Sequence, residues 1–107
     1  MTTPTTVDLP DILTELPESE RDSLIRAGLH LAIRARIQEI QSDIQEAIAQ
    51  IQRYETQYGC SLQQFEEDVL PELNTLKAHE DYNDWFFWQS VYNEKQALLN
   101  SFAPHAG

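Results

Sequence analysis

Residue types that commonly perform chemistry are present in this chain, but they do not form a catalytic or metal-binding set. His79, Glu80 and Asp84 are acceptable metal ligands, and the two carboxylates lie one helical turn apart. A helical di-metal site takes Glu-x-x-His motifs from two helices together with further carboxylates, and no such pair of motifs occurs here. We therefore expect no metal site and no cofactor.

Signatures of the common enzyme classes are also missing from the sequence. The only glycines are Gly28, Gly59 and Gly107, which excludes the glycine-rich loops that bind phosphates. There is no Gly-x-Ser-x-Gly nucleophile elbow, and the Ser, His and Asp residues are scattered along the chain. The sequence predicts no catalytic residues and a protein that is not an enzyme.

Cys60 is the only cysteine, so no disulfide can form within the chain. No His, Lys or Arg lies close to it in the sequence to lower its pKa and activate the thiol. Cys60 precedes Ser61 and Phe65 at the spacing of a hydrophobic staple, in which apolar residues on either side of a helix start pack together. We predict that Cys60 packs and does not react.

Charge is the strongest compositional signal in this chain of 107 residues. The 18 acidic residues outnumber the 7 basic ones and give a formal net charge of -11. Such a surface repels nucleic acid and anionic membranes and favours a basic protein partner, although it also simply keeps a small protein soluble. There is no apolar run of about 18 residues that would span a bilayer, and the N-terminus lacks a secretory signal pattern. We expect a cytoplasmic protein with no membrane contact.

Apolar periodicity and the absence of strand or hairpin signals predict an all-α protein. We expect a short helix over 8–16, a long helix over 19–58, a connecting helix over 61–70, a loop over 71–79 and a last helix over 80–102. Gly59 supplies a left-handed stop, and Ser61 with Gln64 forms a capping box. Asp81 and Asp84 would favour the positive end of the last helix, and Pro104 would close that helix.

The long helix carries apolar residues at spacings of three and four, which is typical of a coiled-coil seam. The seam consists of Ile33, Ile37, Ile40, Ile44, Ala47, Ile51, Tyr54 and Tyr58. The last helix has a matching stripe of Trp85, Trp88, Tyr92, Leu99 and Phe102, widened by Phe87, Val91 and Leu98. We expect these helices to form an antiparallel helical hairpin with the short helix over the turn. The predicted domains are an N-terminal arm with a short helix (1–17) and a helical hairpin domain (18–107).

The part of the long helix over 24–35 has a second apolar face. Leu24, Gly28, Leu31 and Ala35 fall within about 60° of one another at 3.6 residues per turn. Gly28 lowers helix propensity but lets another backbone approach closely. This face should be covered by the chain's own first helix, by a second copy or by a different protein, and the sequence leaves these three open.

Four of the seven basic residues lie on the same part of the long helix: Arg21, Arg26, Arg34 and Arg36. In so acidic a protein they make a weak footprint for DNA, so we do not expect nucleic-acid binding. Neutralising an acidic partner or a second copy is an equally good interpretation.

A second candidate surface lies around residues 79–89, which read HEDYNDWFFWQ. Four successive aromatic residues cover about 300° of a helix, so one hairpin core cannot bury them all. Phe86 and Tyr82 lie off the main stripe, which indicates either an interface or packing under the loop over 71–79. Carboxylates crowd the same region, with Lys77 the only base among them: Glu66, Glu67, Asp68, Glu72, Glu80, Asp81 and Asp84. They form either a binding surface for a basic protein or a solvated face.

Residues 51–66 read IQRYETQYGCSLQQFE, in which a long helix ends in Tyr-Gly before a Ser-x-x-x-Phe-Glu segment. This pattern, together with the aromatic string that follows, resembles small acidic helical antitoxins of prokaryotic toxin–antitoxin pairs. The resemblance implies a protein that binds a small basic toxin, often a ribonuclease, and occludes its active surface. Many antitoxins also bind DNA, but this chain has no ribbon-helix-helix or helix-turn-helix pattern.

These features predict a non-catalytic, antitoxin-like module that occludes a basic partner such as a small ribonuclease toxin. The candidate partner-binding residues are Leu24, Gly28, Leu31, Ala35, Glu66, Glu67, Asp68, Tyr82, Asp84 and Phe86. The alternative is a homo-oligomeric coiled-coil scaffold or adaptor subunit, with a homodimer as its simplest form.

Overall fold

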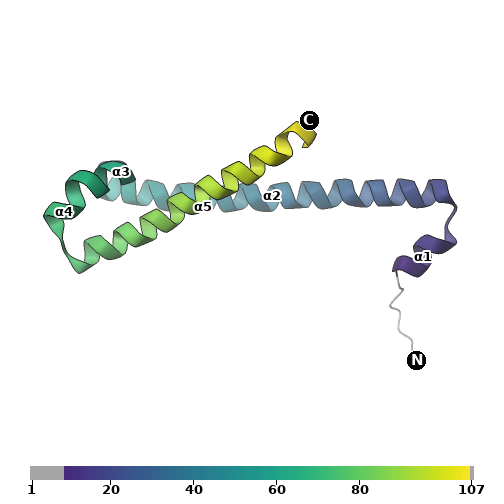
Figure 1. Cartoon of the computed structure of the whole chain (residues 1–107), viewed down its shortest axis with the longest axis horizontal. Coiled ribbons are helices and arrows are strands. Elements are labelled where there is room, and N and C mark those ends of the chain that lie inside the picture. Colours follow the sequence, from purple (N-terminus) through teal and green to yellow (C-terminus); the bar gives the residue numbers. More distant parts are fainter. Residues whose placement is uncertain (1–8, 107) are drawn as a thin grey trace, which may run out of the picture. The chain divides into compact units, whose positions relative to one another are not determined.

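The structure is a computed structural model that describes residues 9–106 and the side chains of residues 11–102. Its elements, in chain order, are α1 (Leu9–Glu15), α2 (Glu18–Tyr58), α3 (Leu62–Gln64), the π-helical turn η1 (Phe65–Val69), α4 (Leu70–Leu73) and α5 (Leu76–Ala106) (Figure 1). The described residues contain no strand. The predicted all-α class, with two long helices and short helices between them, is confirmed.

The chain divides into two compact units, the first ending at Arg36 and the second beginning at Ile37. The division lies inside α2. The predicted arm (1–17) and hairpin domain (18–107) stay a prediction. The second unit is the helical hairpin, in which α5 runs back along the C-terminal part of α2 after the turn formed by α3, η1 and α4 (Figure 1).

The core of the hairpin follows the predicted seam. Five α2 residues at alternating spacings of four and three are buried: Ile40, Ile44, Ala47, Ile51 and Tyr54. Phe65 of η1 and Ala78 and Trp85 of α5 complete the buried apolar set. Because apolar surface removed from water contributes about 25 cal/mol per Å², this shared seam holds α5 against α2.

Three residues of the predicted stripes are exposed. Ile33 is 44% exposed and belongs to the first unit, not to the hairpin. Phe87 is exposed because it lies about 200° around α5 from the buried Trp85. Leu98 is also partly exposed, so the widened stripe on α5 is narrower than the sequence indicated.

The start of the turn has the predicted stop and cap. Gly59 has a φ of 70°, a left-handed conformation that costs glycine little. Ser61 Oγ accepts a hydrogen bond from the Gln64 backbone N–H at 3.2 Å. Cys60 packs against the core cluster that contains Phe65, as the staple spacing predicts.

The expected loop over 71–79 is wrong, because helical structure continues through most of it. In η1 the Leu70 N–H donates to the Phe65 carbonyl five residues back, and α4 begins again at Leu70 with Pro71 in its first turn. Proline is tolerated there because backbone N–H groups of a first turn have no helical partner. Only Asn74, left-handed with φ 41°, and Thr75 separate α4 from α5.

The last helix is longer at both ends than expected. Thr75 Oγ1 accepts a hydrogen bond from the Ala78 backbone N–H at 3.1 Å, the arrangement of a helix N-cap, so α5 begins at Leu76. Asp81 and Asp84 therefore lie in later turns and not at the positive end of the helix. The backbone of α5 continues past Pro104 to Ala106.

We expect Phe65→Ala to lower the free energy of unfolding by about 3–5 kcal/mol, because Phe65 is fully buried and its removal leaves a cavity. The matched control is Phe87→Ala, which removes the same ring from a residue 56% exposed and should cost less than about 1 kcal/mol. Urea unfolding followed by circular dichroism measures both. Equal losses for the two variants would contradict the position of the core.

Candidate protein-binding surfaces

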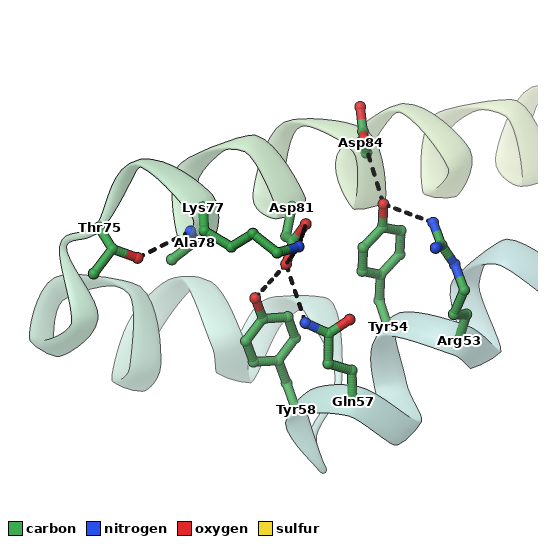
Figure 2. A network of polar contacts seen from close by, with 9 residues as sticks. All are labelled: Arg53, Tyr54, Gln57, Tyr58, Thr75, Lys77, Ala78, Asp81 and Asp84. Atoms are coloured by element: carbon green, nitrogen blue, oxygen red, sulfur yellow. Dashed lines mark hydrogen bonds and ion pairs between the residues drawn. The ribbon is translucent and has the colours of Figure 1, made fainter.

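A polar network joins α5 to α2 near the turn of the hairpin, and Asp81 is its centre (Figure 2). Asp81 is 5% exposed, and its carboxylate accepts hydrogen bonds from Tyr58 Oη at 2.5 Å and Gln57 Nε2 at 3.2 Å. Lys77 Nζ, one turn earlier on α5, lies 2.9 Å from Asp81 Oδ1 and 3.0 Å from Oδ2. The sequence groups Asp81 with the surface carboxylates, but in the structure Asp81 is buried and its carboxylate is bonded to these three donors.

The pKa values of Asp81 and Tyr58 favour a structural role for this network over a catalytic one. Burial by itself would raise the pKa of Asp81, but the hydrogen bond from Tyr58 and the contact with Lys77 outweigh it and hold that pKa below its usual value. Burial, and then the hydrogen bond to Asp81, raises the pKa of Tyr58 to about 12. Each group is thereby moved away from the neutral pH range in which a general acid or base works.

Asp84 lies on the same flank of α5 as this network. Its Oδ2 is 3.4 Å from Tyr54 Oη, which also accepts a hydrogen bond from Arg53 at 3.0 Å (Figure 2). Burial, and then the charge of Asp84, raises the pKa of Tyr54. We call the exposed polar residues here the polar flank: Arg53, Lys77, Glu80, Asn83 and Asp84.

Phe86 and Tyr82 occupy the opposite flank of α5, about 160° around the helix from Asp84 at 3.6 residues per turn. Phe86 is 52% exposed and its ring centroid is 6.0 Å from that of Tyr82. Tyr82 in turn stacks on the buried Phe65 at 6.4 Å and donates a hydrogen bond to Glu66 Oε2 at 2.7 Å. We call Glu66, Tyr82 and Phe86 the aromatic flank.

The predicted partner-binding residues of the hairpin therefore fall into two groups. Glu66, Tyr82 and Phe86 lie together, and Glu67 and Asp68 follow Glu66 as exposed residues of η1. Asp84 belongs to the polar flank instead. Tyr82 is only partly exposed and packs against the core cluster, so it supports this surface from below as much as it contributes to it.

The first unit holds the remaining predicted residues, on the N-terminal part of α2. Leu24 is 53% exposed, Leu31 is 66% exposed and Ala35 is exposed. A Cβ added to Gly28 would meet no atom within 4 Å. The described residues of α1 leave these side chains uncovered, so the interpretation in which the first helix folds over them does not hold for this structure.

Several residues that form these surfaces or position them were not identified from the sequence. Ile25 and Leu29 are also exposed beside the predicted face of α2. Thr75 shows an N-cap signal that was available, since a threonine follows Asn74 and precedes a helical pattern. The burial of Asp81 has no comparable signal, because it depends on two residues more than 20 positions earlier in the chain.

Cys60 has the environment of a packed thiol. It is partly buried against the core cluster, and burial followed by the charge of Asp68 raises its pKa. A raised thiol pKa lowers the fraction of the reactive thiolate at neutral pH.

The described part of the chain has neither a cluster of metal-ligating side chains nor a membrane-spanning helix. No group of three or more His, Cys, Asp or Glu side chains there is placed to hold a metal ion. No helix there is both long enough and apolar enough to cross a membrane. His79 contacts the Asn74 side chain at 3.2 Å, away from Asp84.

Comparison with known proteins adds no relative. No protein-family model matches the chain, and neither a curated protein nor a solved structure is significantly similar to it.

We expect Asp81→Asn to lower the free energy of unfolding at pH 7 by about 1.5–3 kcal/mol, since hydrogen bonds to a buried charged group contribute in that range. The pKa of Asp81 is depressed in the folded chain, so its stabilisation is complete above the pKa of the unfolded chain, about pH 4. It is lost as the pH falls through the lower folded pKa. Urea midpoints from pH 7 down to pH 2 should therefore converge for the two proteins.

Asp84→Asn is the matched control, because Asp84 is exposed and makes one long contact. It should change stability by less than about 0.5 kcal/mol at pH 7. A constant difference between wild type and Asp81→Asn down to pH 2 would show that the carboxylate charge of Asp81 is not the stabilising feature.

Proposed function

We propose that this chain is a non-catalytic protein-binding module that captures a basic protein partner on the aromatic flank of its hairpin. Inhibition would be steric and electrostatic, as in an antitoxin that occludes the active surface of a small ribonuclease toxin. The single-cysteine composition suits binding in the cytoplasm. The observation that carries the proposal is the exposed Phe86, which contacts Tyr82, a residue that is itself bonded to Glu66 and packed on the buried Phe65.

The packing beneath Phe86 should increase binding affinity, because interfaces gain most from aromatic residues that need little reordering on binding. Tyr82 contacts Phe86 on one side and the fully buried Phe65 on the other. Its hydroxyl is held by Glu66. Phe86 is thus presented by the folded hairpin itself, and a partner would bury it without having to order the surrounding chain.

The carboxylates at the start of η1 favour a partner with a basic surface. Glu66, Glu67 and Asp68 are three consecutive exposed carboxylates, and the chain has no lysine or arginine between Arg53 and Lys77. A surface that binds phosphate through Lys and Arg is complementary to such a patch, and complementary charge raises both the association rate and the specificity. A basic nucleic-acid-binding protein therefore fits this flank better than an acidic or neutral one.

The homo-oligomeric scaffold is the alternative, and the uncovered apolar face of α2 in the first unit favours it. The two functions differ in what co-purifies with the chain. A binding module should bring down one stoichiometric basic protein, and an antitoxin should have the gene of that protein beside its own. A scaffold should be recovered with copies of itself alone.

We expect Phe86→Ala to weaken binding of the partner recovered by a tagged pull-down at least tenfold, since an aromatic anchor at an interface commonly contributes about 2 kcal/mol or more. Glu67→Lys with Asp68→Lys should weaken it further and slow association, because both reverse the charge of exposed residues that directly follow Glu66 of the aromatic flank. Isothermal titration calorimetry with the purified partner gives the affinities, and stopped-flow mixing gives the association rates.

Glu46→Lys with Glu94→Lys is the matched control, because it changes the net charge equally at two exposed residues that lie on neither flank. Helicity by circular dichroism should be the same for all variants. If the control weakens binding as much as Glu67→Lys with Asp68→Lys, only net charge matters and the aromatic flank is not the binding surface. Recovery of the chain alone, as a defined oligomer, would overturn the proposal.

A further inference from the structure

The N-terminal part of α2 presents an apolar strip with small residues at its middle. At 3.6 residues per turn, Leu24, Ile25, Leu31, Ala32 and Ala35 all lie within about 60° of the direction of Gly28. Leu24, Ile25 and Leu31 are between 43% and 66% exposed, and both alanines are exposed. Gly28 is open to solvent, with nothing within 4 Å of an added Cβ. We call this strip the Gly28 face.

We propose that the Gly28 face binds the Gly28 face of a second copy of this chain, with the two helices antiparallel and crossing at Gly28. The contact is isologous, so the same strip serves both copies and the assembly closes as a dimer. This inference uses only residues of the first unit and is independent of the aromatic flank.

The apolar residues match in this register. A two-fold axis through the Gly28 crossing keeps each residue on its own side of the strip. It sets that residue near one on the same side of the second copy that lies about equally far from Gly28 in the other direction. Leu24 then meets Leu31 of the second copy, and Ile25 meets Ala32, a large residue against a small one. The two glycines meet at the centre, where the missing side chains allow the backbones to approach closely.

Charges along the two edges of the Gly28 face select the antiparallel direction. One edge carries Glu18, Asp22 and, about four turns after Asp22, Arg36, and the other edge carries Glu20 and Arg34. In an antiparallel pair each edge faces itself in reverse, so Glu20 lies near Arg34 of the second copy and Arg36 lies near the acidic residues of its own edge. Exposed ion pairs contribute little to affinity because water and salt screen them, so their main effect is on orientation.

The parallel arrangement brings like charges together. In a parallel pair, the edge with Asp22 and Arg36 on one copy faces the edge with Glu20 and Arg34 on the other. Residues with similar numbers then lie at the same level along the helices, so Arg34 lies near Arg36 and Glu20 lies near Asp22. Like charges at such positions are unfavourable.

Arg21 lies on the strip itself, about 20° from the direction of Gly28. In the antiparallel pair it faces Ala35 and lies beside Arg36 of the second copy, whereas in the parallel pair the two Arg21 residues meet each other. The charge pattern therefore favours the antiparallel pair over the parallel one, which the apolar residues alone would not decide.

The contact is short, about 26 Å of helix for residues 20–36, so we expect dissociation in the micromolar range. Sedimentation equilibrium of the full chain from about 1 to 500 μM should show a monomer–dimer equilibrium. Leu31→Asp should remove the dimer while leaving helicity unchanged. A chain that stays monomeric at the highest concentration, or forms larger species without a dimer, would overturn the proposal.

Charge reversal tests the register. Glu20→Arg places two arginines together at both ends of the contact, and Arg34→Glu places two glutamates together, so each should weaken the dimer at least tenfold. Combining both changes in one chain should restore it, and so should mixing the two single variants, because every contact in the mixed dimer is again between opposite charges. Arg26→Glu is the matched control, since Arg26 lies about 160° from Gly28 on the far side of the helix, and it should leave the dimer unchanged.

Cross-linking tests the direction independently of charge. Leu24→Cys and Leu31→Cys are made separately in a Cys60→Ala background and then mixed under mild oxidation. The antiparallel pair predicts a mixed disulfide between positions 24 and 31 in excess of either self-linked product. Preferential self-linkage of each variant would show a parallel pair, and failure of the double charge reversal to restore the dimer would refute the proposed register.

Discussion

The enclosure of Trp85 by three rings from two other elements is the interaction on which the hairpin depends. Its indole stacks against Tyr54 at 5.7 Å and Tyr58 at 6.1 Å from α2, and lies 5.4 Å from Phe65 of η1. Its Nε1 is buried without a hydrogen-bond partner, at a cost of about 1–3 kcal/mol. Burying roughly 200 Å² of indole contributes about 5 kcal/mol, so packing outweighs the unpaired donor. Both flanks of α5 take their positions from this buried residue.

Much of the hairpin follows from local rules that the sequence displays. The seam from Ile40 to Tyr54 needs only helical periodicity, and the stop at Gly59 and cap at Ser61 need only the conformational preferences of glycine and serine. Those elements were therefore predictable one residue at a time. The division of α2 at Arg36 was not, because it reflects where tertiary contacts cease while the helix itself continues.

Two of the errors share one cause, which is that proline and aspartate were interpreted from their local preferences alone. Pro71 was expected to end a helix, but the π-helical turn before it lets a new helical segment begin where its missing N–H has no consequence. Asp81 was expected to favour a helix N-terminus, but α5 starts five residues earlier and Asp81 is buried by donors from α2. In each case the deciding contact lies elsewhere in the chain or in an unusual hydrogen-bond register.

The two proposed surfaces make different physical demands, and these explain why they lie on different units. An anchor such as Phe86 is effective when its support is rigid, and the hairpin core supplies that support through Phe65 and Tyr82. Self-pairing of a helix needs only exposed apolar residues and a close approach, which a single uncovered helix around Gly28 can offer. Because the surfaces share no residue, a dimer would carry two intact aromatic flanks. A partner with two binding sites gains affinity from such a dimer only where both flanks can engage it at once, since the gain comes from effective concentration and not from any new contact.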